Sequence, residues 1–202
     1  MSTSRVYSIG HSNHPIEKFL QLLELHRIEV LVDVRSVPAS RFAPQFGLHR
    51  LRASVVEAGR AYVFLGKELG GRPDGAEYYD ADGRVLYGRR AAAPDFVDGI
   101  DRLAELAARS RVAMLCSEEN PESCHRRLLV SRALAPRGIG VEHIRGDGRL
   151  QQESELAPME DAQGGLFDAP GAAWRSTHPV RPPGKPPASM APKRARPSKP
   201  RQ

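Results

Sequence analysis

The segment LCSEENPESCHRR, residues 115–127, contains both cysteines of the chain, and a histidine and two arginines directly follow the second cysteine. A thiolate is a nucleophile and a metal ligand, and a guanidinium binds phosphate or carboxylate through parallel hydrogen bonds. Asn120 is a preferred helix cap and Pro121 suits the first helical position. A helix is therefore expected from residue 120, and in or just after its first turn lie Cys124, His125 and Arg126.

The N-terminus of a helix carries a partial positive charge, which favours an anion and lowers the pKa of a nearby thiol. We therefore predict that Cys124 has a lowered pKa and acts as nucleophile or proton donor. His125 and Arg126 are predicted to bind the substrate. In the alternative interpretation, Cys124 packs against the sheet as a small apolar residue and Arg126 is solvated, because buried inert cysteines are common.

Cys116 ends an apolar run, and this position favours a place in the core over a catalytic role. Zinc sites usually take two cysteines that are two to four residues apart. Seven residues separate Cys116 from Cys124, so the spacing does not predict a metal site, although His125 and His11 could add ligands. Two cysteines also do not make a disulfide framework, and we expect reduced thiols.

Two further polar clusters follow apolar strands. Asp33 and Arg35 are two positions apart, so they share a strand face and can pair directly. Either they form a structural ion pair, or Asp33 is a general base and Arg35 binds an anion. His11 is a candidate acid or base, or it only caps the next helix, and Ser12 beside it is counted with the substrate-binding residues. Glu119 is the third candidate for proton transfer.

The segment YVFLGKELGGRP, residues 62–73, contains a glycine pair that permits a tight turn or the close approach of backbone to a ligand. We therefore count Gly70 and Gly71 with the substrate-binding residues. The pair lies in a Gly- and Asp-rich stretch, residues 65–93, that is longer than most loops of compact domains. Its part EYYDADGRVLYG either covers the pocket as a flap or is a surface excursion.

Strands and helices that alternate along the chain must position these residues. Buried strands are predicted at residues 5–10, 29–35, 61–66, 111–116 and 141–144, and helices at 11–26, 47–59, 94–110 and 120–136, the first capped by Ser12 or Asn13. Parallel strands need crossovers, which are usually helices. We therefore expect an α/β fold: a single three-layer, Rossmann-like domain with a mostly parallel sheet of about five strands. No dinucleotide or NTP phosphate loop is present, and no cofactor is expected.

All parallel strands point the same way, so the three polar clusters after the strands share one edge of the sheet. In open α/β sheets, ligands bind in the crevice at the carboxyl ends of the strands. This edge is therefore the predicted site. The clusters are Gly10–Asn13, Asp33–Ser36 and Cys116–Glu119.

The C-terminal residues 169–202 have no Asp or Glu, eight Lys and Arg, and nine of the 17 prolines. This composition buries too little apolar surface to fold, so we predict a disordered, basic tail that binds polyanions. The α/β domain is expected over residues 1–150, with an extension to 168 left open. Residues 1–168 sum to a charge of about −2, which suits a small-molecule enzyme as much as a nucleic-acid binder. No signal peptide or membrane span is apparent, so a cytoplasmic protein is expected.

Five segments taken together, YSIGHSN, LVDVRSVPAS, YVFLGKELGGRP, LCSEENPESCHR and VEHIRGDGRL, resemble the domain of unknown function 488 family over about residues 5–150. The resemblance implies a compact α/β domain with Rossmann-like layering, and it implies no reaction. The family's pattern is matched at Gly10, His11, Ser12, Asp33, Arg35, Pro38, Gly70, Gly71, Cys116, Glu119, Pro121, Cys124, His125 and Arg126.

Three functions fit these residues. The first is an enzyme that acts on an anionic substrate, a phosphate-bearing small molecule, a nucleotide or a nucleic acid. The second is a non-catalytic module that binds a ligand or nucleic acid, which needs the arginines but no acid–base pair. The third is a metal-dependent enzyme, which needs a close cluster of His, Cys or Asp with an open coordination position. The sequence carries no indication of oligomeric state.

Overall fold

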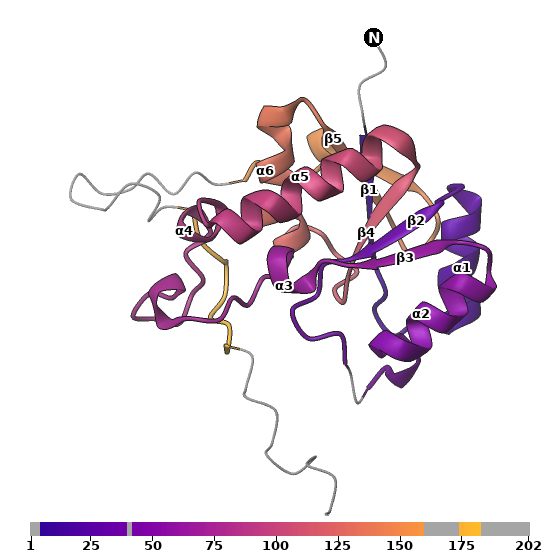
Figure 1. Ribbon diagram of the computed structural model, residues 1–202, viewed down its shortest axis with the longest axis horizontal. Coiled ribbons are helices and arrows are strands. Elements are labelled where there is room, and N and C mark those ends of the chain that lie inside the picture. Colours follow the sequence, from indigo (N-terminus) through magenta and orange to yellow (C-terminus); the bar gives the residue numbers. More distant parts are fainter. Residues whose placement is uncertain (1–4, 40–41, 160–173, 183–202) are drawn as a thin grey trace, which may run out of the picture.

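The computed structural model describes residues 5–39, 42–159 and 174–182 (Figure 1). Six strands form one sheet in the order β3-β2-β4-β1-β5-β6. Strands β1 to β5 pair in parallel, and β6 is antiparallel to β5. The strands are β1 Arg5–Gly10, β2 Val30–Asp33, β3 Ala61–Phe64, β4 Val112–Cys116, β5 Gly140–Ile144 and β6 Leu150–Gln152.

Helices cover both faces of this sheet, so the predicted α/β fold with three layers is confirmed. The longer α-helices are α1 Ile16–Leu25, α2 Leu48–Glu57 and α5 Pro94–Arg109, and the short ones are α3 Gly66–Leu69, α4 Tyr87–Ala91 and α6 Arg132–Leu134. A π-helix, η3 Arg126–Ser131, precedes α6, and single 3-10 turns are η1 Pro44–Phe46, η2 Ala76–Tyr78, η4 Ala135–Arg137 and η5 Glu153–Glu155.

The central strands are buried on both faces, which is why they read as continuous apolar runs. In β1, Val6 belongs to the core under α5 and η3, whereas Tyr7 belongs to the core under α1 and α2. Side chains alternate between faces along a strand, so each strand contributes to both cores. The helices complete these cores with Phe19 and Leu51 on one side and Phe96 on the other.

Beyond shifts of one or two residues, the elements differ from the predicted ones at three places. Helix α1 begins at Ile16 after Pro15, and no side chain caps it; Ser12 instead has a positive φ of 47°. Helical structure after β4 begins only at Arg126, because Asn120 accepts a bond from the backbone N–H of Glu122 and forms a separate turn. The sixth strand, β6, extends the sheet beyond the five strands expected.

The long stretch 65–93 is folded, because it contains α3, η2, α4 and an antiparallel bridge between Tyr79 and Val85. Residues 174–182, which we call the C-terminal strap, pack on it. The strap lies inside the segment predicted to be disordered, and that prediction fails here because three strap backbone bonds join Trp174, Ser176 and Val180 to residues 83–88. The rest of the predicted tail, 169–173 and 183–202, lies outside the described residues.

The indole of Trp174 anchors the strap. Its Nε1 donates to the carbonyl of Leu128 at 2.6 Å, and its ring packs against the core under α5. Within the described ranges, no helix is both long and apolar enough to cross a membrane.

Candidate functional site

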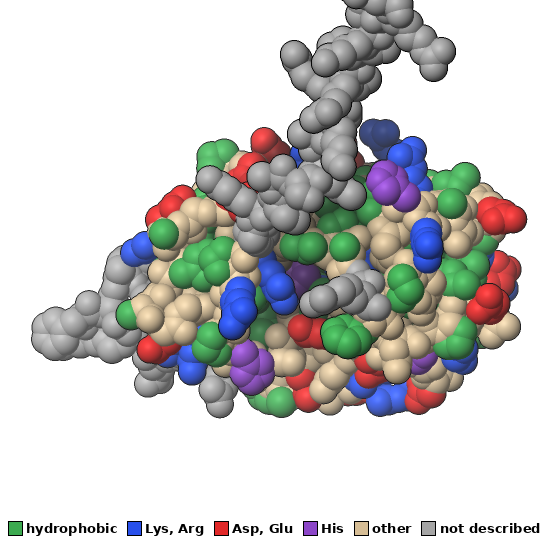
Figure 2. Space-filling view, turned by 90° about the horizontal axis from the view of Figure 1, so that it is seen from below, with side chains coloured by type: hydrophobic (Ala, Val, Ile, Leu, Met, Phe, Trp, Pro, Cys, Tyr) green, Lys and Arg blue, Asp and Glu red, His purple; other side chains and the backbone are tan. Residues whose placement is uncertain are grey.

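A cavity of about 540 Å³ lies at the carboxyl edge of the sheet. Figure 2 looks onto this edge and shows Lys, Arg and His side chains around a hollow in the face. Five segments line the cavity: the loop after β2, Gly71 with Arg72, Tyr87 of α4, the turn after β4 and the strap. The polar and charged lining residues are Arg35, Ser36, Arg72, Cys116, Ser117, Glu118, Ser123, His125, Ser176, Thr177 and His178.

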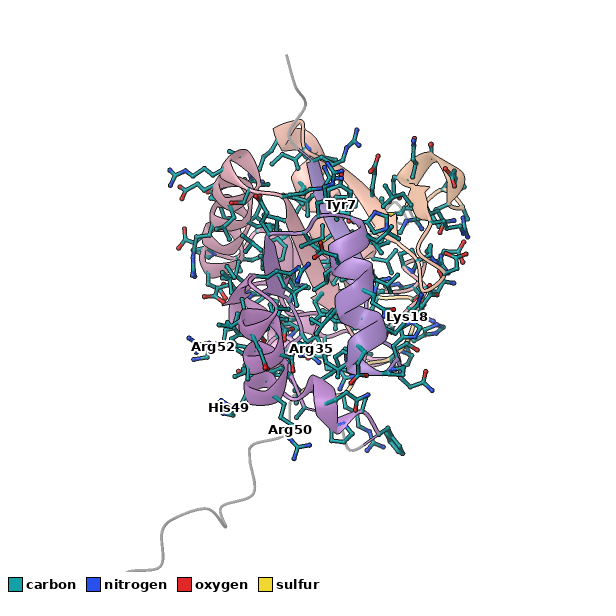
Figure 3. All side chains as sticks on the ribbon, turned by 90° about the vertical axis from the view of Figure 1, so that its right-hand side faces the viewer. Tyr7, Lys18, Arg35, His49, Arg50 and Arg52 are labelled. Carbon is teal, nitrogen blue, oxygen red and sulfur yellow. The ribbon has the colours of Figure 1, made fainter. Side chains whose placement is uncertain are left out.

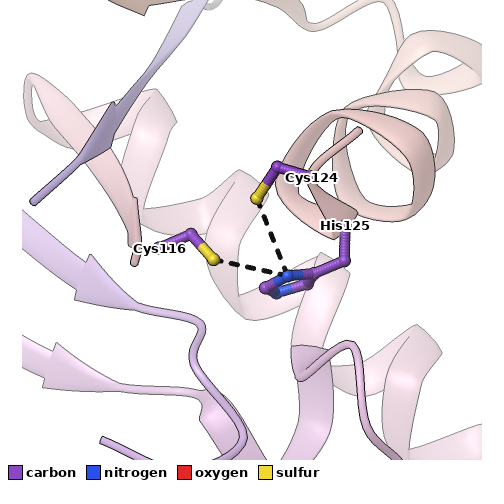
Figure 4. A group of neighbouring side chains, drawn as sticks. All are labelled: Cys116, Cys124 and His125. Atoms are coloured by element: carbon purple, nitrogen blue, oxygen red, sulfur yellow. Dashed lines mark hydrogen bonds between the residues drawn. The ribbon is translucent and has the colours of Figure 1, made fainter. Parts of the chain in front are cut away.

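Cys116 and His125 meet at the wall of this cavity (Figure 4). The Sγ atom of Cys116, at the end of β4, is 3.5 Å from Nδ1 of His125. The other ring nitrogen, Nε2, donates to the carbonyl of Val34 at 2.9 Å, which fixes the orientation of the ring. Gly71 makes room for it, since a Cβ there would lie 2.5 Å from the imidazole. The ring therefore presents Nδ1 to the thiol.

Cys124 completes a group of three. Its Sγ is 3.9 Å from the same Nδ1 atom of His125, and its side chain is buried. Burial and the neighbouring Cys116 raise the pKa of Cys124. The pKa of Cys116 is lowered by the hydrogen bond from the Cys124 thiol, by the charge of His125 and by the hydrogen bond from His125. The predicted low pKa of Cys124 is therefore wrong, because burial disfavours its thiolate and helical structure begins only after it, at Arg126. Cys116, expected in the core, is the thiol at the cavity.

His125 has a pKa raised above its ordinary value. Burial lowers the pKa, but the charge of Cys116 and the hydrogen bond to it outweigh burial. The three potential ligand atoms of Cys116, Cys124 and His125 lie within 4.8 Å of one another, so this group could hold a metal ion. The structure thus brings together the cluster that the sequence spacing did not predict.

Asp33 and Arg35 form the structural ion pair that was one of the two interpretations. Nε and Nη2 of Arg35 donate to the carboxylate of Asp33 at 2.8 and 2.5 Å, and the Tyr62 hydroxyl donates to it at 2.6 Å. Burial lowers the pKa of Arg35, but these bonds to Asp33 raise it above its ordinary value. Asp33 is thus enclosed by donors, which leaves a general-base role without geometric support, whereas Arg35 lines the cavity.

Figure 3 shows Arg35 at the same edge of the sheet as the start of α2. His49, Arg50 and Arg52 of that helix are exposed to solvent.

His11 is buried and stacks on Phe46 with ring centroids 4.3 Å apart. Its Nδ1 donates to the carbonyl of Ser12 at 2.6 Å, and its Nε2 has no partner among the described residues. Burial and the charge of Arg35 lower the pKa of His11 to about 4, so the ring is neutral near pH 7. The backbone N–H of Ser12 donates to the carbonyl of Ser117 at 2.8 Å, which ties this cluster to the turn after β4.

The two glutamates of this turn take different roles. Both carboxylate oxygens of Glu119 accept from Arg145, at 2.9 and 2.7 Å, and the backbone of Gly146 adds a third bond. Burial raises the pKa of Glu119, but Arg145 and Gly146 lower it overall. Glu118, which sequence reasoning did not select, lines the cavity, and burial and the nearby Cys116 raise its pKa.

Arg126 is fully buried and holds the turn in place. Its Nη1 donates to the carbonyl of Glu118, and its Nη2 donates to the carbonyl of Glu119 at 2.6 Å. Arg126 is therefore neither solvated nor part of the cavity lining, and the geometry assigns it a structural role. The turn also packs closely against Gly10, where a Cβ would collide with the backbone of Glu118. Gly70 packs closely against Ser36.

A Ser–His–Glu arrangement, which resembles a catalytic triad, lies inside the domain. Nδ1 of His143 is 2.6 Å from Oγ of Ser8, and its Nε2 is 3.1 Å from a carboxylate oxygen of Glu153. Ser8 and His143 have no exposed surface, so no substrate reaches them. This group is a buried polar network that links β1, β5 and η5.

Of the residues singled out from the sequence, Arg35, Gly71 and His125 line the cavity. Cys116 and Glu118 belong to a cluster predicted at this edge but are not singled out from the sequence, and the sequence pattern does not indicate the strap. The signal for Cys116 was its place at the end of a strand. The strap carried no comparable signal, because its contacts depend on residues almost a hundred positions away.

Comparison with known protein families finds a match over residues 15–133 to a family model described as "Domain of unknown function DUF488". The match covers more than half of the chain. No curated protein matches the chain, and no solved structure does.

Proposed function

The chain belongs to the DUF488 family, and we propose that it is an enzyme that acts on a phosphate-bearing or otherwise anionic small molecule in the cavity at the carboxyl edge of its sheet. One observation carries the proposal: a thiol and an imidazole, Cys116 and His125, lie 3.5 Å apart in the wall of a cavity that two arginines also line. A pure binding module needs the arginines but not this pair.

The cavity supports a small molecule as the substrate. Small-molecule sites are concave, about 300–1,000 Å³ in volume, and combine apolar walls with a few converging polar groups. Here the apolar part comes from Val37, Tyr87 and Pro179, and the hydrogen-bond donors include several hydroxyl groups. Arg72 supplies positive charge for an anionic group, whereas the charge of Arg35 is already balanced by Asp33. A ligand with an anionic end and an apolar or aromatic part, as in a nucleotide, matches both.

Glu118 is the carboxyl group at the cavity and is the candidate for proton transfer. Asp33 and Glu119 are held by Arg35 and Arg145, so we assign them to positioning the loops. The backbone N–H of His11 donates to the carbonyl of Cys116 at 3.0 Å, so His11 lies next to Cys116. The neutral Nε2 of His11 can accept one hydrogen bond.

The test is a turnover screen with nucleotides, sugar phosphates and other phosphate esters, on the full chain and on Cys116→Ser and His125→Gln. His49→Gln, an exposed histidine on α2, is the matched control. We expect at least one substrate whose turnover falls by about 100-fold or more in both site variants, the range usual for lost acid–base or nucleophilic groups, and is unchanged in the control. Turnover that survives both site variants would refute the assignment.

A second candidate is a nucleic-acid-binding module, which is favoured by the six Lys and Arg in residues 183–202. Phosphate contacts from these residues would give weak, sequence-independent affinity that falls steeply with salt. Binding to a DNA oligonucleotide that is equal for the full chain and for residues 1–182 at low salt would exclude this role of the tail.

A further inference from the structure

We infer that Cys116, Cys124 and His125 form a binding site for one thiophilic divalent metal ion, with zinc as the best match. Their three ligand atoms lie within 4.8 Å of one another (Figure 4). The inference adds a cofactor to the proposed function and rests on it only for the use of the cavity beside the site.

The distances fit a tetrahedral ion. With Zn–S of about 2.3 Å and Zn–N of about 2.0–2.1 Å, a sulfur and a nitrogen bound to one zinc lie about 3.6 Å apart. The two observed Sγ–Nδ1 distances, from Cys116 and from Cys124 to His125, are 3.5 and 3.9 Å. An ion can therefore bind without a large movement of the three side chains.

The surroundings of His125 and Cys124 match those of metal ligands. A ligating histidine usually donates its other ring N–H to a backbone carbonyl or a carboxylate, which fixes the tautomer. His125 does so to Val34, which leaves Nδ1 for the ion. Nη1 of Arg126 lies 3.9 Å from Sγ of Cys124, where its charge would favour the second thiolate that a bound ion requires. A thiol–imidazole pair alone would not need Cys124, whereas a metal ion would use it.

The site is open on one side. Cys116 and His125 line the cavity, and Cys124 lies behind them in the core. Catalytic zinc sites have three protein ligands and a fourth position for water or substrate, and two cysteines with one histidine are a known set. Because Cys116 and His125 line the cavity, a fourth ligand, water or an anionic group of a substrate, would come from the cavity side.

The experiment uses the full chain, stripped with a chelator and then titrated with Zn²⁺ or Co²⁺ alone. We expect one zinc per chain by elemental analysis, and a thiolate-to-cobalt charge-transfer band with Co²⁺. Cys124→Ser, Cys116→Ser and His125→Gln should each weaken the affinity roughly 100-fold or more. The control His49→Gln removes an exposed histidine on α2, outside the cavity, and should bind as the wild type does.

Thiol alkylation of the wild type gives a readout that needs no variant. Bound Zn²⁺ should slow the labelling of both cysteines at least tenfold, and chelation should restore it. Zinc binding that is absent, that leaves both labelling rates unchanged, or that persists in the cysteine variants would overturn the inference. If the chelated protein turns a substrate over, the metal has no catalytic role, and the proposed enzymatic function still stands. If the protein binds zinc but turns over no anionic substrate, only the proposed enzymatic function is refuted.

Discussion

The Sγ atom of Cys116 lies 3.5 Å from Nδ1 of His125, although eight residues lie between them along the chain. The turn between them folds back because Arg126 binds two of its carbonyls and because Gly10 lets its backbone approach β1. A core arginine and a glycine thus place a strand-end thiol against an imidazole. The candidate site depends on these supports as much as on its own side chains.

Gly71→Ala should disturb the site directly. The added Cβ would lie 2.5 Å from the ring of His125, which cannot retreat without losing its bond to Val34. Overpacking of this kind costs about 1–3 kcal/mol in the free energy of unfolding. Urea denaturation measures it, and Gly140→Ala, where a Cβ meets no atom within 4 Å, should cost much less. Equal, small effects of both substitutions would show that His125 is not held by this contact.

Asp33→Asn should destabilise the domain strongly. Arg35 and Asp33 are almost fully buried, so the neutral amide leaves the guanidinium without its counter-charge. Breaking one partner of a buried pair typically costs about 3–5 kcal/mol. The control Asp101→Asn breaks an exposed pair with Arg137 and should cost less than about 1 kcal/mol. If Asp33→Asn unfolds in urea at the same midpoint as that control, the pair does not support the loop after β2.

Much of the fold could be predicted from the sequence, because β1, β2 and β4 are buried on both faces and α5 has one apolar side. The mostly parallel sheet and the shared edge follow from this pattern. The position of Cys124 could not be predicted in this way. Asn120 and Pro121 indicate a helix from residue 120, whereas η3 begins at Arg126, after Cys124, and Cys124 is buried. The structural role of Arg126 could not be predicted either, because its partners are backbone carbonyls, which a side-chain pattern does not indicate.

Truncation should distinguish the strap from the rest of the tail. A chain that ends at residue 168 loses the bond from Trp174 to Leu128 and the backbone bonds of Ser176 and Val180. We expect a loss of at least about 2 kcal/mol, or roughly 4–8 °C in melting temperature. A chain that ends at residue 182 keeps these bonds and should melt as the full chain does. Identical melting of the two truncated chains would mean that the strap does not dock in solution.

The buried His143 should make stability depend on pH. Burial is the main cause of its lowered pKa, the charges of Arg126 and Arg127 add to it, and the carboxylate of Glu153 opposes it. The folded state therefore disfavours the imidazolium, so the stability contribution is full above the unfolded pKa of about 6.5 and is lost as the pH falls below it. Between pH 7 and 5, the wild type should lose more stability than His143→Gln does. His49→Gln, on the surface, should keep the wild-type slope, and an unchanged slope in His143→Gln would contradict this account.

The most direct measurement of the central claim is the binding of small anions to the cavity. Inorganic phosphate, pyrophosphate and nucleoside monophosphates can be titrated calorimetrically into the metal-stripped full chain and into Arg72→Ala, with Arg102→Ala as the control, because that arginine pairs with Glu68 away from the cavity. We expect one anion site per chain, weakened about tenfold or more in Arg72→Ala, as expected for a lost charge-assisted bond, and unchanged in Arg102→Ala. Absence of saturable binding, or equal binding by both variants, would contradict an anion-binding site at the carboxyl edge of the sheet.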